Sequence, residues 1–325
     1  MTLEQILTTT FLVAILTSGL RLAIPILLAV IGEIITEKGG VLNLGLEGMM
    51  LMGAMAGFVV TWHLENNPAV GIDPTAAAWL GLLAGIIAGL LMGLIMAFLA
   101  VTLKADQVIS SVMLVLLGQG LSAYIFRQQF DTLAARVTGF EPIPIPILSD
   151  IPVLGEVLFN QDMAVYLTVL VVLGSWFLLN HTTLGLNIRA VGEKPSAAET
   201  SGLSVSRVRY TATLIGAALA GLGGAVLSVA QLHIFREGVT AGRGWIAVAL
   251  VIFARWNPGL AVVGALLFGL ADAVQFRIQA LGDESIPYEV LLMLPYLLTI
   301  LVLLRGIKKT EQPEALGEPY IRGAR

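Results

Sequence analysis

The chain has 325 residues, of which 57% are hydrophobic and only 12% are charged, and its formal net charge is −4. A soluble domain carries about 25% charged residues, so this composition excludes a cytosolic enzyme. The acidic balance also excludes a nucleic-acid-binding protein, whose surface needs a basic excess. The absence of cysteine excludes disulfides and thiolate metal sites. We therefore predict an integral membrane protein.

A membrane-spanning helix needs about 20 mostly apolar residues, and the chain contains a series of such segments. The fold class expected from them is an all-α, polytopic helical membrane protein with about nine spans, in a range of about eight to ten. The start of the chain is open to two interpretations: residues 3–31 form one tilted helix, or a surface helix followed by a span interrupted near Arg21 and Pro25. The predicted spans are 11–31, 45–62, 76–101, 108–126, 164–179, 210–232, 245–254, 259–276 and 290–304.

Lysine and arginine in the connecting segments predict the orientation in the membrane. Segment 180–209 carries four of these residues, and the tail after residue 304 carries five. Twelve of the eighteen basic residues fall on one side if the spans alternate, and this side is predicted to be cytoplasmic. Arg243 is among the five basic residues predicted on the opposite, external side. The proline-rich segment 127–162 is predicted to be an external loop, extended with short turns, where an external partner can bind.

Glycines recur at every fourth position of segment 76–101 and therefore lie on one stripe of the expected helix. Such small-residue stripes let helix backbones approach closely in lipid. A second stripe of this kind begins at Gly216. Packing alone explains both stripes, and surfaces that also let helices slide during transport are the other interpretation. The helix-packing residues of the first stripe are Gly81, Gly85, Gly89 and Gly93.

Two further segments do not have the pattern of ordinary helices: 32–54 (GEIITEKGGVLNLGLEGMMLMGA) and 236–253 (REGVTAGRGWIAVALVIF). Each contains a Gly-Val pair, at Gly40 and Gly238, followed by a glycine-rich break and a short apolar stretch. The predicted topology puts the first break near the cytoplasmic face and the second near the external face. Broken or re-entrant segments at corresponding positions indicate an inverted repeat whose breaks mark the transport site.

Polar side chains within apolar segments are costly in lipid and are expected to face the protein interior. Asp272 and Gln275 share one helix face. A structural pair or a place at the lipid headgroups is the competing interpretation for each polar residue. The candidates for the translocation path are Glu33, Asn43, Glu47, Gln107, Ser111, Gln119, Trp245 and Asp272.

The cytoplasmic segment 181–209 is predicted to contain a short helix. Pro195 suits the first turn of a helix, and Gly202 suits the position just past its end. Arg207 and Arg209, at the start of the next span, are expected at the headgroup level. A small helix held against the cytoplasmic face is typical of a docking element, and an ordinary amphipathic connector is the alternative.

Two stretches carry a family resemblance. The order GLNIRAVGEKPSAAETSG resembles the coupling loop of permease subunits in the branched-chain amino acid, ribose and nucleoside group of ABC importers. The segment GEIITEKGGVLNLGLEGMMLMGA resembles the signature of nucleoside, or "simple sugar", permeases in that group. The resemblance extends from Arg21 to Leu304. It implies that the following residues seat in a groove of the ATPase: Gly185, Arg189, Gly192, Glu193, Lys194, Pro195, Ala198, Glu199 and Gly202.

The resemblance also implies an organisation and a set of partners. Residues 1–304 would form a single transmembrane permease domain, and residues 305–325 a charged cytoplasmic tail. The chain would lie in a bacterial plasma (inner) membrane as a multi-pass protein and form a translocation path for nucleosides. The implied partners are an ABC ATPase subunit that holds ATP-Mg, a second permease subunit that is identical or different, and an external substrate-binding lipoprotein or periplasmic protein. The lipid bilayer surrounds the chain, and no nucleic acid is expected as a partner.

No catalytic machinery is expected in this chain. It contains no GxxxxGK[ST], HExxH or GxSxG motif, and its three histidines are far apart in the sequence. We therefore expect a transport subunit without a catalytic residue, metal or cofactor of its own, served by a partner that hydrolyses ATP. Two alternatives stay open: an ABC permease for a simple sugar or a branched-chain amino acid, and an ion-driven secondary transporter with Glu47 or Asp272 as its coupling site.

Overall fold

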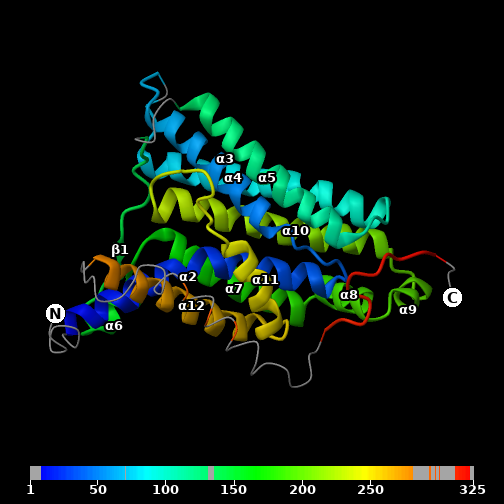
Figure 1. The fold of residues 1–325 in the computed structure, drawn as a ribbon. Helices are drawn as coiled ribbons and strands as arrows, with labels where there is room; N and C mark the ends of the chain where they lie inside the picture. Colours follow the sequence, from blue (N-terminus) through cyan, green and yellow to red (C-terminus); the bar gives the residue numbers. More distant parts are fainter. Residues whose placement is uncertain are drawn as a thin grey trace.

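The computed structural model describes residues 9–69, 71–130, 135–280, 293, 297, 300 and 312–322. Helices dominate the described residues (Figure 1). The elements are α2 (Thr9–Lys38), α3 (Leu46–Glu65), α4 (Pro74–Ala97), the π-helical turn η1 (Phe98–Thr102), α5 (Gln107–Gln129), β1 (Ile143–Pro144), α6 (Leu154–Leu158), β2 (Asn160–Gln161), α7 (Met163–His181), α8 (Thr183–Glu193), α9 (Pro195–Thr200), α10 (Val205–Ala225), the π-helical turn η2 (Val226–Gln231), α11 (Arg243–Phe253) and α12 (Pro258–Ala280).

Six helices among the described residues are long and apolar enough to cross a membrane. These spans lie in α2, α4 with η1, α5, α7, α10 with η2, and α12. The predicted count of nine is therefore not confirmed. α11 has 11 residues, a length of about 16 Å, which is too short for a hydrocarbon core of about 30 Å. α3 has 20 residues but is not one of the six, and the predicted span 290–304 lies outside the described residues except at three single positions.

Side-chain caps explain where several helices begin. The Asp73 carboxylate accepts the Thr75 and Ala76 amides at the start of α4, where Pro74 needs no hydrogen bond. Asp106 caps α5, and Asp162 caps α7 in the same way. These capping acids lie just before the apolar segments. The predicted spans, which were chosen for apolar character, therefore begin slightly later than these three helices do.

Two helices form the centre of the bundle. α10 packs against α2, α3 and α4, and α2 packs against α10 and α12 (Figure 1). The packing depends on glycine, because a Cβ at Gly89 would collide with the Ala217 carbonyl oxygen and with the backbone of Gly221 on α10. Gly81, Gly85 and Gly93 likewise lie against neighbouring helices. The stripe predicted from the sequence is thus a contact surface between helices.

In the described residues, the start of the chain forms one helix and not a surface helix followed by an interrupted span. α2 runs without interruption through Arg21 and Pro25 to Lys38. The break therefore begins at Gly39, and Glu33 and Glu37 lie in a helix rather than in the break expected from residue 32 onward. Gly40 has a φ of +83° and Gly238 a φ of +67°, so both Gly-Val pairs begin with a left-handed glycine. The inverted repeat stays a prediction.

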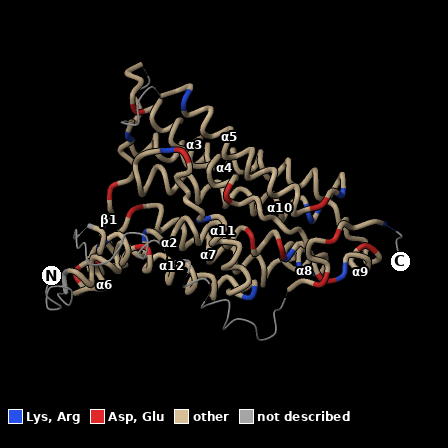
Figure 2. The backbone as a smooth tube through the Cα atoms, viewed as in Figure 1, with Lys and Arg blue, Asp and Glu red and all other residues tan. Residues whose placement is uncertain are grey.

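The external segment is more ordered than predicted. Ile143 and Pro144 pair antiparallel with Gln161 and Asn160, and the short helix α6 lies between the two strands. This end of the bundle is opposite the end that carries α8, α9 and residues 312–322 (Figure 1). Charged residues gather near both ends, and few lie between them (Figure 2). Such a distribution suits a chain whose middle lies in lipid.

Candidate functional site

The two broken segments meet inside the bundle. The Glu47 carboxylate, at the start of α3, accepts hydrogen bonds from Thr240 Oγ1 (2.5 Å), the Gly242 amide (2.9 Å) and the Gly244 amide (2.7 Å). The last two amides belong to the N-cap residue and to the first turn of α11, where backbone N–H groups have no partner within the helix. Because Glu47 is only 4% exposed, its charge is compensated by this helix start rather than by water.

The expectation that the two breaks lie near opposite faces stays a prediction, and the segments that follow the breaks meet inside the bundle. The Gly39–Gly40 turn does lie at the end that carries α8, since the Gly192 backbone contacts Lys38 and Gly40. The segment after it returns into the bundle and reaches α11. A Cβ at Gly244 would collide with the Glu47 backbone, so glycine at this position permits the contact.

An ion pair lies beside this junction. Arg243 Nη2 lies 3.2 Å from Asp272 Oδ2 of α12, and both side chains are about one-tenth exposed (10% and 11%). The sequence had placed Arg243 on the external side, and the structure instead places it within the bundle. The signal that points to it is Asp272 itself, because an acid inside a span needs a cationic partner.

Four of the candidate path residues hold the non-helical segment 41–45. Glu33 Oε1 accepts the Asn43 amide (3.0 Å), and Gln107 Oε1 accepts the Leu42 amide (2.7 Å). Ser111 Oγ accepts the Leu44 amide (3.1 Å), and Asn43 Oδ1 accepts the Gly45 amide (3.0 Å). Irregular backbone at membrane depth requires such partners. Each of these side chains therefore has a structural task.

Two polar atoms of this group keep unused hydrogen-bonding capacity. Glu33 Oε2 and Gln107 Nε2 are buried and have no hydrogen-bond partner in the described part of the chain. Glu37, one turn after Glu33, accepts the Trp256 indole N–H (2.5 Å), a pairing that sequence reasoning did not identify. Glu33 and Gln107 bind neighbouring residues of segment 41–45, so the acceptor and the donor without partners among the described residues form a polar site at the break between α2 and α3.

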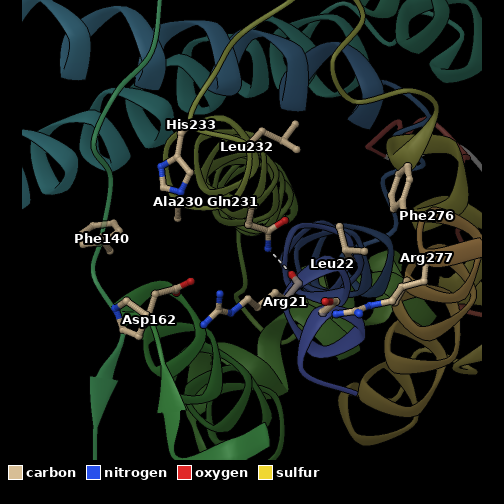
Figure 3. A pocket seen from close by; sticks show the side chains of 13 residues that line it. Arg21, Leu22, Phe140, Asp162, Ala230, Gln231, Leu232, His233, Phe276 and Arg277 are labelled. Atoms are coloured by element: carbon tan, nitrogen blue, oxygen red, sulfur yellow. Dashed lines mark hydrogen bonds between the residues drawn. The ribbon is translucent and has the colours of Figure 1, made fainter. Parts of the chain in front are cut away.

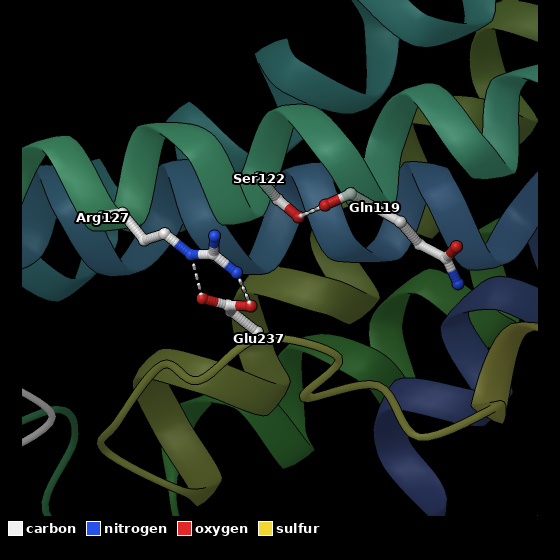
Figure 4. Close-up of polar contacts among 4 residues, drawn as sticks. All are labelled: Gln119, Ser122, Arg127 and Glu237. Atoms are coloured by element: carbon white, nitrogen blue, oxygen red, sulfur yellow. Dashed lines mark hydrogen bonds and ion pairs between the residues drawn. The ribbon is translucent and has the colours of Figure 1, made fainter.

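Gln119 and Trp245 do not join the group. Gln119 lies on the exposed face of α5, and its carbonyl accepts the Ser122 hydroxyl (3.3 Å) while its side chain points away (Figure 4). Trp245 is 43% exposed on α11. The next two residues, Ile246 and Ala247, pack in the core, because successive residues of a helix are rotated by about 100° around its axis.

A cavity of about 560 Å³ opens at the end opposite α8 and α9 (Figure 3). Arg21 extends into it and donates to Gln161 Oε1 (2.8 Å), and the Gln231 amide donates to the Arg21 carbonyl. Burial raises the pKa of Asp162 and lowers the pKa of His233 at its rim. No candidate path residue from the sequence lines this cavity, which lies at the predicted external end and has both apolar and charged side chains in its wall.

The predicted cytoplasmic helix is present as α9, preceded by α8. Pro195 is the first residue of α9, and Gly202 follows its end with a φ of +89° and open space around it. Gly185 lies tightly against the end of α7, and Gly192 lies against the end of α2, so both glycines pack within the chain. Ala198 is buried as well.

The remaining residues of this segment divide between exposed and internal roles. Glu193 and Lys194 are exposed at the junction of α8 and α9, whereas Arg189 is half-buried with its Nε lacking a partner among the described residues. The Glu199 carboxylate accepts a hydrogen bond from the Tyr320 hydroxyl. Arg209 is almost fully buried and donates to the Glu318 carbonyl (2.7 Å), so it does not lie at the headgroups as expected.

Comparison with known proteins gives the family. Residues 15–303 match the family described as "Branched-chain amino acid transport system / permease component". The chain is 42% identical to a putative glucose ABC transporter permease protein of Haloferax volcanii, covering 96% of this chain and 98% of that protein. It is 37% identical to a guanosine ABC transporter permease protein of Bacillus subtilis (93% and 95%) and 34% identical to a nucleoside ABC transporter permease protein of Lactococcus lactis (92% and 93%). No solved structure matches.

The match covers nearly the whole chain, and the six apolar helices agree with it. Members of this family are transport components and not enzymes. The location that follows is the plasma membrane, crossed several times. The chain therefore belongs to the branched-chain amino acid transport system permease family and is a transmembrane permease subunit of an ABC importer.

Proposed function

We propose that this permease subunit carries nucleosides. The observation that carries the proposal is the similarity, over more than nine-tenths of the chain, to permeases named for guanosine and for nucleosides. A nucleoside is uncharged and offers both hydrogen-bond donors and acceptors. Glu33 Oε2 and Gln107 Nε2, buried without partners among the described residues, suit such a molecule during its passage.

The junction at Glu47 argues against an amino acid as substrate. A free carboxylate binds well at a helix start, where N–H groups and the helix dipole favour negative charge. At the start of α11 this position is filled by the chain's own Glu47 carboxylate. A substrate carboxylate would have to displace it, whereas an uncharged substrate would not.

We assign ATP coupling to α8 and α9. The exposed residues Glu193, Lys194 and Ser196 would dock on an ABC ATPase subunit that holds ATP-Mg. Gly192 packs directly on the end of α2, so a displacement of α8 acts on the helix that carries Glu33. A second permease, identical or different, would complete the path, and an external substrate-binding protein would deliver the substrate.

A sugar is the second candidate substrate. It rests on the 42% identity to the putative glucose permease of Haloferax volcanii. Sugars are also uncharged and rich in hydroxyl groups, so the same polar site accommodates either class.

The test is uptake into vesicles that contain the intact importer, purified through a tag on this chain. We expect ATP-dependent uptake of labelled guanosine or adenosine that excess unlabelled glucose does not reduce. Uptake of glucose, unaffected by nucleosides, would replace the nucleoside proposal with the sugar. Uptake by this chain alone, driven by a proton or sodium gradient without ATP, would contradict the coupling mechanism.

A further inference from the structure

The carboxy-terminal residues 312–322 lie along α8 and α9. The Ala315 amide donates to the Gly192 carbonyl at the end of α8 (2.9 Å), and the Gly317 amide donates to the Gly40 carbonyl (3.3 Å). From α10, Arg209 donates to the carbonyls of Glu318 (2.7 Å) and Ala315 (3.4 Å). This segment, expected only as part of a charged tail, is therefore fixed to α8, α10 and the turn after α2.

The same segment holds α9. Tyr320 donates its hydroxyl to Glu199 Oε2 (2.7 Å), and Arg322 Nε lies 3.4 Å from Glu199 Oε1. The Glu199 carboxylate accordingly binds within the chain. Any movement of α9 has to carry residues 320–322 with it or break these contacts.

A groove of about 390 Å³ separates the two elements. One wall is the α8–α9 junction with Glu193, Lys194 and Ser196, and the other wall is the carboxy-terminal segment. The second wall presents the exposed carboxylates of Glu314 and Glu318, for which the described residues supply no hydrogen bond or ion pair. Ile321, 52% exposed, adds an apolar side chain.

We propose that residues 312–322 form the second wall of the ATPase-docking surface and that this groove receives a lysine- or arginine-bearing loop of the ATPase subunit. The inference rests on the proposed coupling role of α8 and α9. The occupant follows from charge: among the described residues that line the groove, three exposed carboxylates stand against one lysine, so a basic side chain is complementary. The position follows from continuity, because the groove adjoins α9 on the predicted cytoplasmic face.

The absence of cysteine makes a direct test possible. Single cysteines are introduced in the intact importer at Ser196 of α9, at Glu314 of the carboxy-terminal segment, and at Asp150 of the external segment as a control. All three side chains are exposed, so the fold should tolerate the substitutions. A short reagent that joins a thiol to a lysine amine then reports which positions lie beside the ATPase subunit.

We expect Ser196→Cys and Glu314→Cys to cross-link to the ATPase subunit and Asp150→Cys to give no product. A product from Ser196→Cys alone would overturn the second wall and leave the proposed coupling role intact. Absence of product from both cytoplasmic positions would overturn the coupling role and, with it, this inference.

A second measurement tests the charge argument. The double variant Glu314→Gln/Glu318→Gln should raise the Kd of the ATPase subunit, re-added to ATPase-depleted membranes, by about two- to tenfold at low salt. The difference should shrink as salt is raised, because exposed charges are screened. Glu141→Gln/Asp150→Asn, which removes two exposed external acids, is the matched control. A Kd equal to that of the control variant at low salt would overturn the proposed groove.

Discussion

The Gly244 amide donates a hydrogen bond of 2.7 Å to Glu47 Oε2, although the two residues are 197 positions apart in the chain. The contact joins the first turn of α3 to the first turn of α11, the helices that follow the two breaks. Because both residues are buried, neither partner has water as an alternative. The junction is therefore expected to stabilise the protein.

Glu47→Gln should destabilise the protein. The amide keeps one acceptor oxygen but turns an NH2 group toward the donors at Gly242, Gly244 or Thr240, so a buried hydrogen bond is lost. We expect a loss of about 1–3 kcal/mol, measured as a lower midpoint in thermal unfolding of the detergent-purified chain. Glu141→Gln, at an exposed external position, is the control and should unfold at the wild-type temperature. Equal midpoints for Glu47→Gln and wild type would contradict the proposed contribution of these hydrogen bonds to stability.

Removal of Arg243 alone should cost more than removal of the whole ion pair. Arg243→Met leaves the buried Asp272 without its cation, for which we expect a loss of about 3–5 kcal/mol. Arg243→Met/Asp272→Leu removes both charges and should recover much of that loss. Thermal unfolding of the two variants side by side measures the difference, and a double variant less stable than Arg243→Met would exclude this pairing.

Gly89→Val should separate α4 from α10. A side chain there meets the Ala217 carbonyl and the Gly221 backbone, so the helices have to move apart. We expect a cost of about 1–3 kcal/mol or more, with lower yield of folded protein. Gly120→Val on α5 is the matched control, because nothing lies within 4 Å of a Cβ at that position. If both valine variants behave alike in yield and thermal unfolding, close packing at Gly89 is not required.

Acid should loosen the link between α5 and the segment before α11. Arg127 donates to both oxygens of Glu237 (2.6 Å each), and this ion pair lowers the pKa of Glu237 (Figure 4). A lowered pKa in the folded protein means that the stabilisation is present above the ordinary glutamate pKa and is lost as pH falls through the folded value. Hydrogen exchange of residues 232–242 should therefore accelerate, relative to the intrinsic rate, as pH falls below the ordinary pKa of glutamate.

Glu237→Gln provides the comparison for this effect. Its exchange in the same segment should already be fast at neutral pH and should show no further acceleration in acid. High salt should weaken the wild-type effect, because the pair is exposed. A wild-type segment whose protection is unchanged across this pH range would contradict a contribution from the pair.

The sequence by itself determined the class of the protein and most of its helices. Apolar segments of sufficient length fold as helices in lipid because the backbone has no other partner there. Acids such as Asp73 and Asp106 mark the helix starts, and Pro195 and Gly202 mark the ends of α9. Gly89 was recognised as a packing position from its spacing. These features depend on neighbouring residues, and neighbouring residues are visible in a sequence.

Only the tertiary structure decided which distant groups meet. The sequence predicted Arg243 on the external side, whereas in the structure α12 places Asp272 beside it within the bundle. The sequence predicted Arg209 at the lipid headgroups, whereas in the structure its guanidinium donates to backbone carbonyls of the carboxy-terminal segment. A buried charge takes its role from its partner, and that partner lies 29 residues away for Arg243 and 109 for Arg209. Hydropathy and spacing describe a segment's own preference for lipid or water, whereas pairing across the bundle depends on how the helices pack.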